Sequence, residues 1–102
     1  MSLRVKYEDL ETVGFDGGGG EILSYQGQVF TGTIVQFDEN NNLICEEEFK
    51  NGHLGGGQRT FYPNGQMEQE YFIKYNKNYG LHRKWDESGT LTYEYNWGPE
   101  PL

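Results

Sequence analysis

Apolar and polar residues alternate in short runs along most of the chain, and turn-forming residues separate these runs. Six runs follow residue 32, namely 33–38, 43–49, 57–62, 67–73, 81–86 and 91–97. A period of two is typical of strands with one buried face. Asn40-Asn41, Asn64-Gly65 and Ser88-Gly89 lie inside successive pairs of runs, and these residues accept the positive φ of tight hairpin turns. The pattern predicts three β-hairpins and no helix longer than about one turn.

The three predicted hairpins repeat with a fixed step of 24 residues. Five columns keep this register without an insertion, and each holds similar residue types. They are Gly32, Gly56 and Gly80; Phe37, Phe61 and Trp85; Leu43, Met67 and Leu91; Glu46, Glu70 and Glu94; and Phe49, Ile73 and Trp97. Self-similarity at a fixed period predicts a repeat architecture in which each hairpin depends on its neighbours.

The fold predicted from these patterns is all-β: an antiparallel meander of hairpin repeats in a single layer, curled over one apolar face. Strand parity assigns the aromatic column of Phe37, Phe61 and Trp85 to the buried side. It also assigns there the alternate residues of each second strand, which are Leu43, Cys45, Glu47 and Phe49; Met67, Gln69, Tyr71 and Ile73; and Leu91, Tyr93, Tyr95 and Trp97. The opposite face is expected to be polar and wet.

Three segments are predicted along the chain: a capping segment at 1–24, the repeats at 25–97 and a tail at 98–102. Within the cap, residues 3–7 alternate like a strand, 8–11 form a turn or one helical turn, and 17–20 form a glycine loop. No Gly-Lys-Ser/Thr follows those glycines, which argues against a phosphate-binding loop. Residues 21–31 are expected to contain a strand and a Gln-Gly turn. Prolines in the tail suit the end of a sheet.

The formal net charge of -8 is distributed unevenly. The first 48 residues hold ten acidic and two basic side chains, whereas the remainder hold six of each. This asymmetry argues against nucleic acid or an anionic membrane as the main partner and favours a basic protein. The alternative is that acidity only keeps a tyrosine-rich protein soluble. With no apolar leader and no stretch long enough to span a membrane, the expected location is the cytoplasm.

The densest acidic patch is predicted to be the partner-binding site. It combines residues before and after the turn of the first hairpin: Asp38, Glu39, Glu46, Glu47 and Glu48. Such a cluster would speed association with a basic protein. The competing interpretation is an ordinary solvated face.

The glutamate column of Glu46, Glu70 and Glu94 has two interpretations that stay open here. Stacked carboxylates could bind a cation or a basic partner, or each glutamate could satisfy a turn or backbone group in its own repeat, since a row of bare carboxylates is repulsive without a partner. His53 and His82 lack neighbours at ligand spacing, and Cys45, the single cysteine, has no nearby histidine in the pattern. We expect no catalytic site, no metal and no cofactor.

The repeat columns resemble the MORN-repeat variant family, in particular its bacterial YwqK-type antitoxin and immunity members. The resemblance covers about residues 25–97 and is carried by Tyr25-x-Gly27-x-x-Phe30-Thr31-Gly32, Leu43-x-x-Glu46-x-x-Phe49-Lys50-Asn51-Gly52 and Phe61-Tyr62-x-Asn64-Gly65-x-Met67-x-x-Glu70. Asn41 departs from the usual turn glycine. The resemblance implies a non-enzymatic protein-binding module that neutralises a toxic effector. The alternative implied is a scaffold repeat that mediates protein or lipid association.

Overall fold

The computed structural model describes residues 3–102 and contains two sheets. The larger has seven strands in the order β1-β5-β6-β7-β8-β9-β10, and the smaller has three in the order β2-β3-β4. The strands before the repeats are β1 (Leu3–Val5), β2 (Glu11–Phe15), β3 (Glu21–Tyr25) and β4 (Gln28–Val29), with one 3-10 turn, η1 (Tyr7–Asp9). Those of the repeats are β5 (Gly32–Phe37), β6 (Leu43–Lys50), β7 (His53–Phe61), β8 (Met67–Lys74), β9 (Lys77–Trp85) and β10 (Leu91–Asn96).

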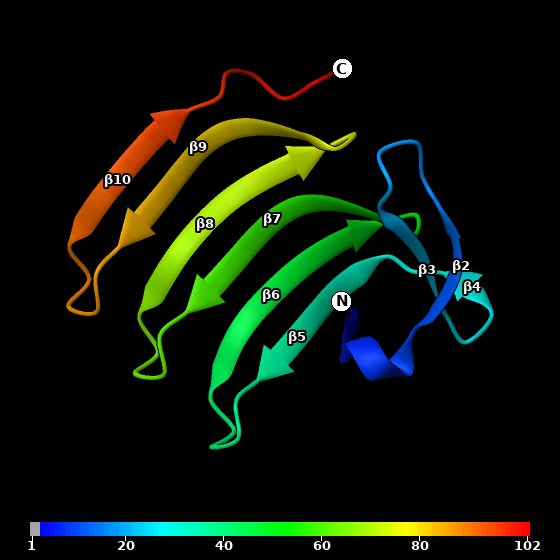
Figure 1. Cartoon of the computed structure of the whole chain (residues 1–102), viewed down its shortest axis with the longest axis horizontal. Helices are drawn as coiled ribbons and strands as arrows, with labels where there is room; N and C mark the ends of the chain where they lie inside the picture. Colours follow the sequence, from blue (N-terminus) through cyan, green and yellow to red (C-terminus); the bar gives the residue numbers. More distant parts are fainter. Residues whose placement is uncertain (1–2) are drawn as a thin grey trace.

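The six repeat strands form three consecutive antiparallel hairpins in one curved layer (Figure 1). Each hairpin closes at the same place, because the aromatic column faces the aliphatic column: Phe37 pairs with Leu43, Phe61 with Met67 and Trp85 with Leu91. A register shift follows that pair in all three hairpins. The predicted all-β hairpin fold and its 24-residue step are therefore confirmed.

The tight turns use the residues that the sequence predicted. Asn41, Gly65 and Gly89 all have positive φ, and in each turn the backbone closes with the same pair of hydrogen bonds. An aspartate opens the first and third turns. The Asp38 carboxylate accepts the backbone N–H groups of Asn40 and Asn42, both at 2.9 Å. Asp38 is therefore part of the turn itself, as the side chain of an Asx turn is.

The N-terminal segment differs from the simple cap expected. Strand β1 pairs in parallel with β5, so the larger sheet is mixed rather than wholly antiparallel. Strand β2, which no alternation predicted, pairs with β3 and completes the small sheet with β4. Gly52 ties this sheet to the repeats, because its N–H donates to Phe30 O at 2.8 Å and its carbonyl accepts from Leu23 N at 2.9 Å.

The fully formed hydrophobic core lies where the small sheet covers the first repeat. Its buried members are Val5, Leu23, Phe30, Ile34 and Phe49, and Leu10, Tyr25 and Leu54 pack against it. This cluster joins β1, β3, the β4–β5 connection, β5 and β6. It anchors one end of the layer to the segment that precedes the repeats.

The expected burial of one whole face is wrong at the other end of the sheet. Tyr93, Tyr95 and Trp97 are 42%, 50% and 47% exposed. The small sheet does not extend that far (Figure 1), so these side chains have one layer behind them and solvent in front. A further correction concerns faces. The register shift between Gln36 and Phe37 pairs Phe37 with Leu43, so both residues lie on the face of Val35 and Glu46 and not on the face of Cys45. The extra residue breaks strict alternation, and Phe37 is 40% exposed.

Candidate protein-binding surfaces

The five acidic residues predicted as a partner site do not lie together as one free patch. Asp38 belongs to the turn, as described above, and its backbone hydrogen bonds lower the pKa of its carboxyl. Glu39 is exposed beside it. Successive residues of a strand point to opposite faces, so Glu47 lies on the other face of β6 from Glu46 and Glu48. Whether these residues bind a partner stays a prediction.

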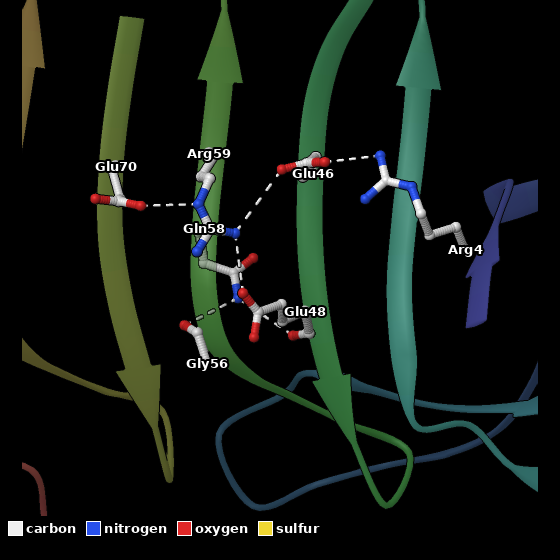
Figure 2. Close-up of polar contacts among 7 residues, drawn as sticks. All are labelled: Arg4, Glu46, Glu48, Gly56, Gln58, Arg59 and Glu70. Carbon is white, nitrogen blue, oxygen red and sulfur yellow. Dashed lines mark hydrogen bonds and ion pairs between the residues drawn. The ribbon is translucent and has the colours of Figure 1, made fainter. Parts of the chain in front are cut away.

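Glu46 and Glu48 are held by arginines (Figure 2). Arg59 on β7 donates from Nε to Glu70 at 2.8 Å and from Nη1 to Glu48 at 2.9 Å, and its Nη1 lies 3.8 Å from Glu46. Arg4 reaches from β1 to the second oxygen of Glu46 at 2.7 Å. Desolvation lowers the pKa of Arg59, but the hydrogen bonds that it donates to Glu48 and Glu70 oppose this, and the pKa is raised overall. These carboxylates are therefore satisfied within the sheet.

Glu47 is a different case, because no ion pair or hydrogen bond to it is present among residues 3–102. It is half-buried opposite Ile34 and Gln58, and desolvation raises the pKa of its carboxyl. Gln58 beside it is 3% exposed and uses its amide to donate to the carbonyls of Glu48 and Gly56. A half-buried carboxylate without a cation is a local cost to stability.

The glutamate column belongs to a row of alternating charge that crosses the sheet. In register order the row runs Glu46, Arg59, Glu70, Arg83 and Glu94, one residue from each strand from β6 to β10; we call it the charged row. Arg83 donates to Glu94 at 2.8 Å, which repeats the contact of Arg59 with Glu70 one period later. Each glutamate of the column thus lies beside an arginine side chain of another strand, which neither interpretation had named.

Sequence reasoning missed the arginines, although a signal was present. Arg59 and Arg83 are themselves 24 residues apart, and each lies 11 residues before a glutamate of the column. Position 35, one period earlier, is a buried valine. Arg4 takes the missing arginine's role from outside the repeats, and its place could not be inferred without knowing that β1 pairs with β5.

The opposite face at the last hairpin is aromatic. Tyr93, Tyr95 and Trp97, which we call the aromatic patch, follow one another at alternate positions, and the Tyr95 and Trp97 rings meet edge to face at 4.9 Å. His82 on β9 lies between Tyr71 and Tyr93, with ring centroids at 5.2 and 5.4 Å. Its Nε2 lies 2.9 Å from Gln69 Oε1. Desolvation, then Lys84, lowers the pKa of His82, so its imidazole is favoured in the neutral form.

A groove of about 930 Å³ lies at the other end of the strands, between the glycine loop after β2 and the turns that join successive repeats. Its lining is mixed in charge and includes Glu48, Lys50, Lys74 and Glu100. The loop glycines are not free for a phosphate, because Gly18 N and Gly20 N both donate to Asp16 Oδ1. Asp16 also lies 3.2 Å from His53 and accepts from Asn76, which ties the loop to both turns.

Cys45 and the side chains that commonly bind metals are the other candidate groups among residues 3–102. Cys45 is half-buried, and burial followed by the charge of Glu47 raises the pKa of its thiol, which opposes thiolate formation. In the same range no three histidine, cysteine, aspartate or glutamate side chains gather around a possible cation position. None of the described residues form a helix with the length and apolarity needed to cross a membrane.

Comparison with known proteins agrees with the repeat but goes no further. Residues 30–51 and 54–75 each match the model of the MORN repeat variant. These ranges contain the first hairpin and most of the second with their connecting turns, whereas the third hairpin lies beyond them. No significant match was found among curated proteins. None was found among solved structures. Two segments of the chain thus match the MORN repeat variant, and the structure adds a third hairpin of the same geometry.

Proposed function

We propose that this chain is a non-enzymatic protein-binding module that acts as an antitoxin or immunity protein in the cytoplasm, where it occludes a basic effector. The observation that carries the proposal is the aromatic patch. Its three residues are 42–50% exposed and follow one another at alternate positions, and exposed tyrosine and tryptophan are favoured anchors of protein interfaces. Repeat modules of this kind use such surfaces to bind other proteins.

The charge distribution supports a basic partner. The net charge is -8, and the acidic residues lie mainly in the first hairpin and the segment before it. Because Arg4 and Arg59 neutralise part of that cluster, we propose that Asp38, Glu39, Glu46, Glu47 and Glu48 attract the partner at long range more than they touch it. Attraction of this type speeds association and weakens with salt.

The test is co-expression with the product of each gene adjacent to the chain's own gene. An immunity protein is expected to rescue growth from one such product and to co-elute with it as a stable complex. The association rate should fall steeply as salt rises. Tyr95→Lys, which places a charge in the aromatic patch, should abolish rescue, whereas Tyr75→Lys, at an exposed tyrosine of a distant turn, should not.

Two results would contradict the proposal. One is the absence of binding at low salt to every neighbouring product. The other is a size that grows with protein concentration in light scattering while no neighbour binds, which would favour the scaffold function instead.

A further inference from the structure

The larger sheet ends at β10 with one side unpaired. Among the described residues, β10 pairs with β9 alone, and the chain beyond it turns back toward the sheet. Trp97 N donates to Gly80 O, Gly80 N donates to Gly98 O, and Glu100 lies 3.6 Å from Lys74 Nζ. Within residues 3–102 no strand lies beyond β10 (Figure 1), so its outer edge presents unpaired backbone N–H and C=O groups, which is the usual template for adding a strand.

The interior of the sheet shows what such an added strand looks like. Strands β6, β8 and β10 are equivalent in the repeat, and β7 and β9 pair antiparallel with the outer sides of the first two. In both cases an arginine lies opposite the glutamate of the charged row: Arg59 opposite Glu46 and Arg83 opposite Glu70. At β10 the equivalent position opposite Glu94 is vacant on the outer side.

The charged row also ends at that edge without a final arginine. Glu46 contacts Arg4 at 2.7 Å and lies 3.8 Å from Arg59, and Glu70 lies between Arg59 and Arg83 in register. Glu94 has Arg83 on one side only, and its side chain is 44% exposed. A guanidinium arriving from the outer side would be the partner that the row lacks, with the planar donors that suit a carboxylate.

The face of β10 opposite Glu94 determines which residues would suit the positions next to that arginine on the added strand. Tyr93 and Tyr95 flank Glu94 in sequence and therefore point to the other face. On a strand added at this edge, the residues on either side of the arginine would lie against the aromatic patch, where apolar or aromatic side chains gain from cross-strand contact.

We propose that the outer edge of β10 binds an extended, antiparallel segment of a partner protein that places an arginine opposite Glu94 and apolar residues against the aromatic patch. This inference rests on the proposed function and names the surface and the partner chemistry for it. A second copy of the chain suits the edge poorly, because its net charge of -8 repels itself and it would bring another Glu94-bearing edge to the same place.

The first experiment uses a peptide that copies β9, residues 77–85, with His82→Val and Lys84→Val, because β9 occupies the equivalent edge of β8 and the proposal places apolar residues on either side of the arginine. Binding of the labelled peptide to the full chain is measured by fluorescence anisotropy, and contacts are mapped by amide NMR shifts. Changing the peptide's arginine to glutamate should weaken binding by about tenfold or more, and shifts should concentrate on β10. Because a short peptide loses entropy on binding, the same segment joined to Leu102 by a Gly/Ser linker raises its effective concentration.

Exchanging the charges of residue 94 and of the peptide distinguishes specific recognition from a change in the stability of the sheet. Glu94→Gln should weaken binding of the arginine peptide about threefold or more, and Glu94→Arg should prefer the glutamate peptide. Glu39→Gln, which removes an equal charge from the first hairpin, should leave peptide affinity within about twofold at moderate salt. Circular dichroism of each variant checks that the sheet is intact.

The outcomes distinguish this inference from the function on which it rests. If neither the free nor the linked segment protects β10, or if the peptide preference ignores the residue at position 94, the edge site is refuted. If a neighbouring gene product still binds and protects another surface, the proposed function stands although the edge site is refuted. Self-association that Glu94→Arg abolishes would overturn the separate partner in favour of a second copy.

Discussion

The first and third hairpins are built on the same 24-residue pattern, yet one is sealed and the other is open. The first hairpin carries Ile34 and Phe49, which pack beneath Leu23 and Phe30 of the preceding segment. The third carries His82 and Trp97 at the equivalent positions, and Trp97, like Tyr93 and Tyr95 on the same face, is 42–50% exposed. Since the hydrogen-bonding register is shared, the difference comes from what lies above the sheet. The covered end thus gains stability, and the other end stays open where we propose that a partner binds.

The largest effect should come from removing the core that seals the first hairpin. Phe30 is 1% exposed and packs against Phe49 with ring centroids 6.1 Å apart. Phe30→Ala should lower the free energy of unfolding by about 3–5 kcal/mol, as measured by urea denaturation. Phe15→Ala is the matched control, because that ring is 69% exposed, and it should cost under about 0.5 kcal/mol. Equal losses would show that the small sheet does not seal the repeats.

The charged row should also matter more near the sealed end. Arg59 contacts Glu48 and Glu70, and its side chain is 22% exposed. Arg59→Met should cost about 2 kcal/mol, because it leaves those partly buried carboxylates facing each other. Arg83→Met removes one contact with Glu94 from a side chain that is 39% exposed and should cost under about 1 kcal/mol. A larger loss for Arg83 than for Arg59 would reverse the comparison.

A similar contrast is expected at the glycine column. Gly56 has φ +101, and a Cβ there would lie 2.7 Å from the Glu48 carboxylate that Arg59 holds. Gly56→Ala should therefore cost about 1–2 kcal/mol from backbone strain and displacement of Glu48. Gly80 has φ +66, and its nearest neighbour for a Cβ is Phe72 at 3.8 Å, so Gly80→Ala should cost about 1 kcal/mol or less. Thermal unfolding of both variants, corrected to one temperature, checks the order.

The smallest predicted effect is a gain in stability at Glu47. Because desolvation raises the pKa of this carboxyl, the folded state binds more protons than the unfolded state between the ordinary value of 4.5 and the raised one. Stability therefore falls as pH rises through that window and stays lower above it. Glu47→Gln should stabilise the protein at neutral pH by under about 1 kcal/mol, and the two curves should converge below the window. The exposed Glu39→Gln serves as control, and an equal gain there would point to net charge alone.

Most of the repeat geometry could be predicted from the sequence, but the packing of the N-terminal segment over the repeats could not. The turn residues predicted where each hairpin closes, and a tight turn fixes the register of the two strands that it joins. The extra residue after each such pair was invisible to strict alternation, and so Leu43 was assigned to the wrong face. Strand β2 was missed because Glu11–Phe15 alternates weakly and includes Gly14.

The candidate binding surfaces could also be predicted only in part from the sequence. The acidic residues of the first hairpin are obvious in the sequence, but their arginine partners come from β1 and from the next repeat, and only the register brings them together. Exposure of the aromatic patch could not be inferred either, since alternate aromatic residues predict a buried face whenever a second layer exists. Here the second layer covers one end only, and tertiary contacts between distant segments decide that.

Amide hydrogen exchange of the free protein tests the contrast between the two ends most directly. If the first hairpin is sealed and the third is open, protection should be highest in β3, β5 and β6 and should fall along the sheet, with β10 exchanging at least about tenfold faster than β6. Uniform protection from β5 to β10 would contradict the account, because the last hairpin would then be as firmly held as the first.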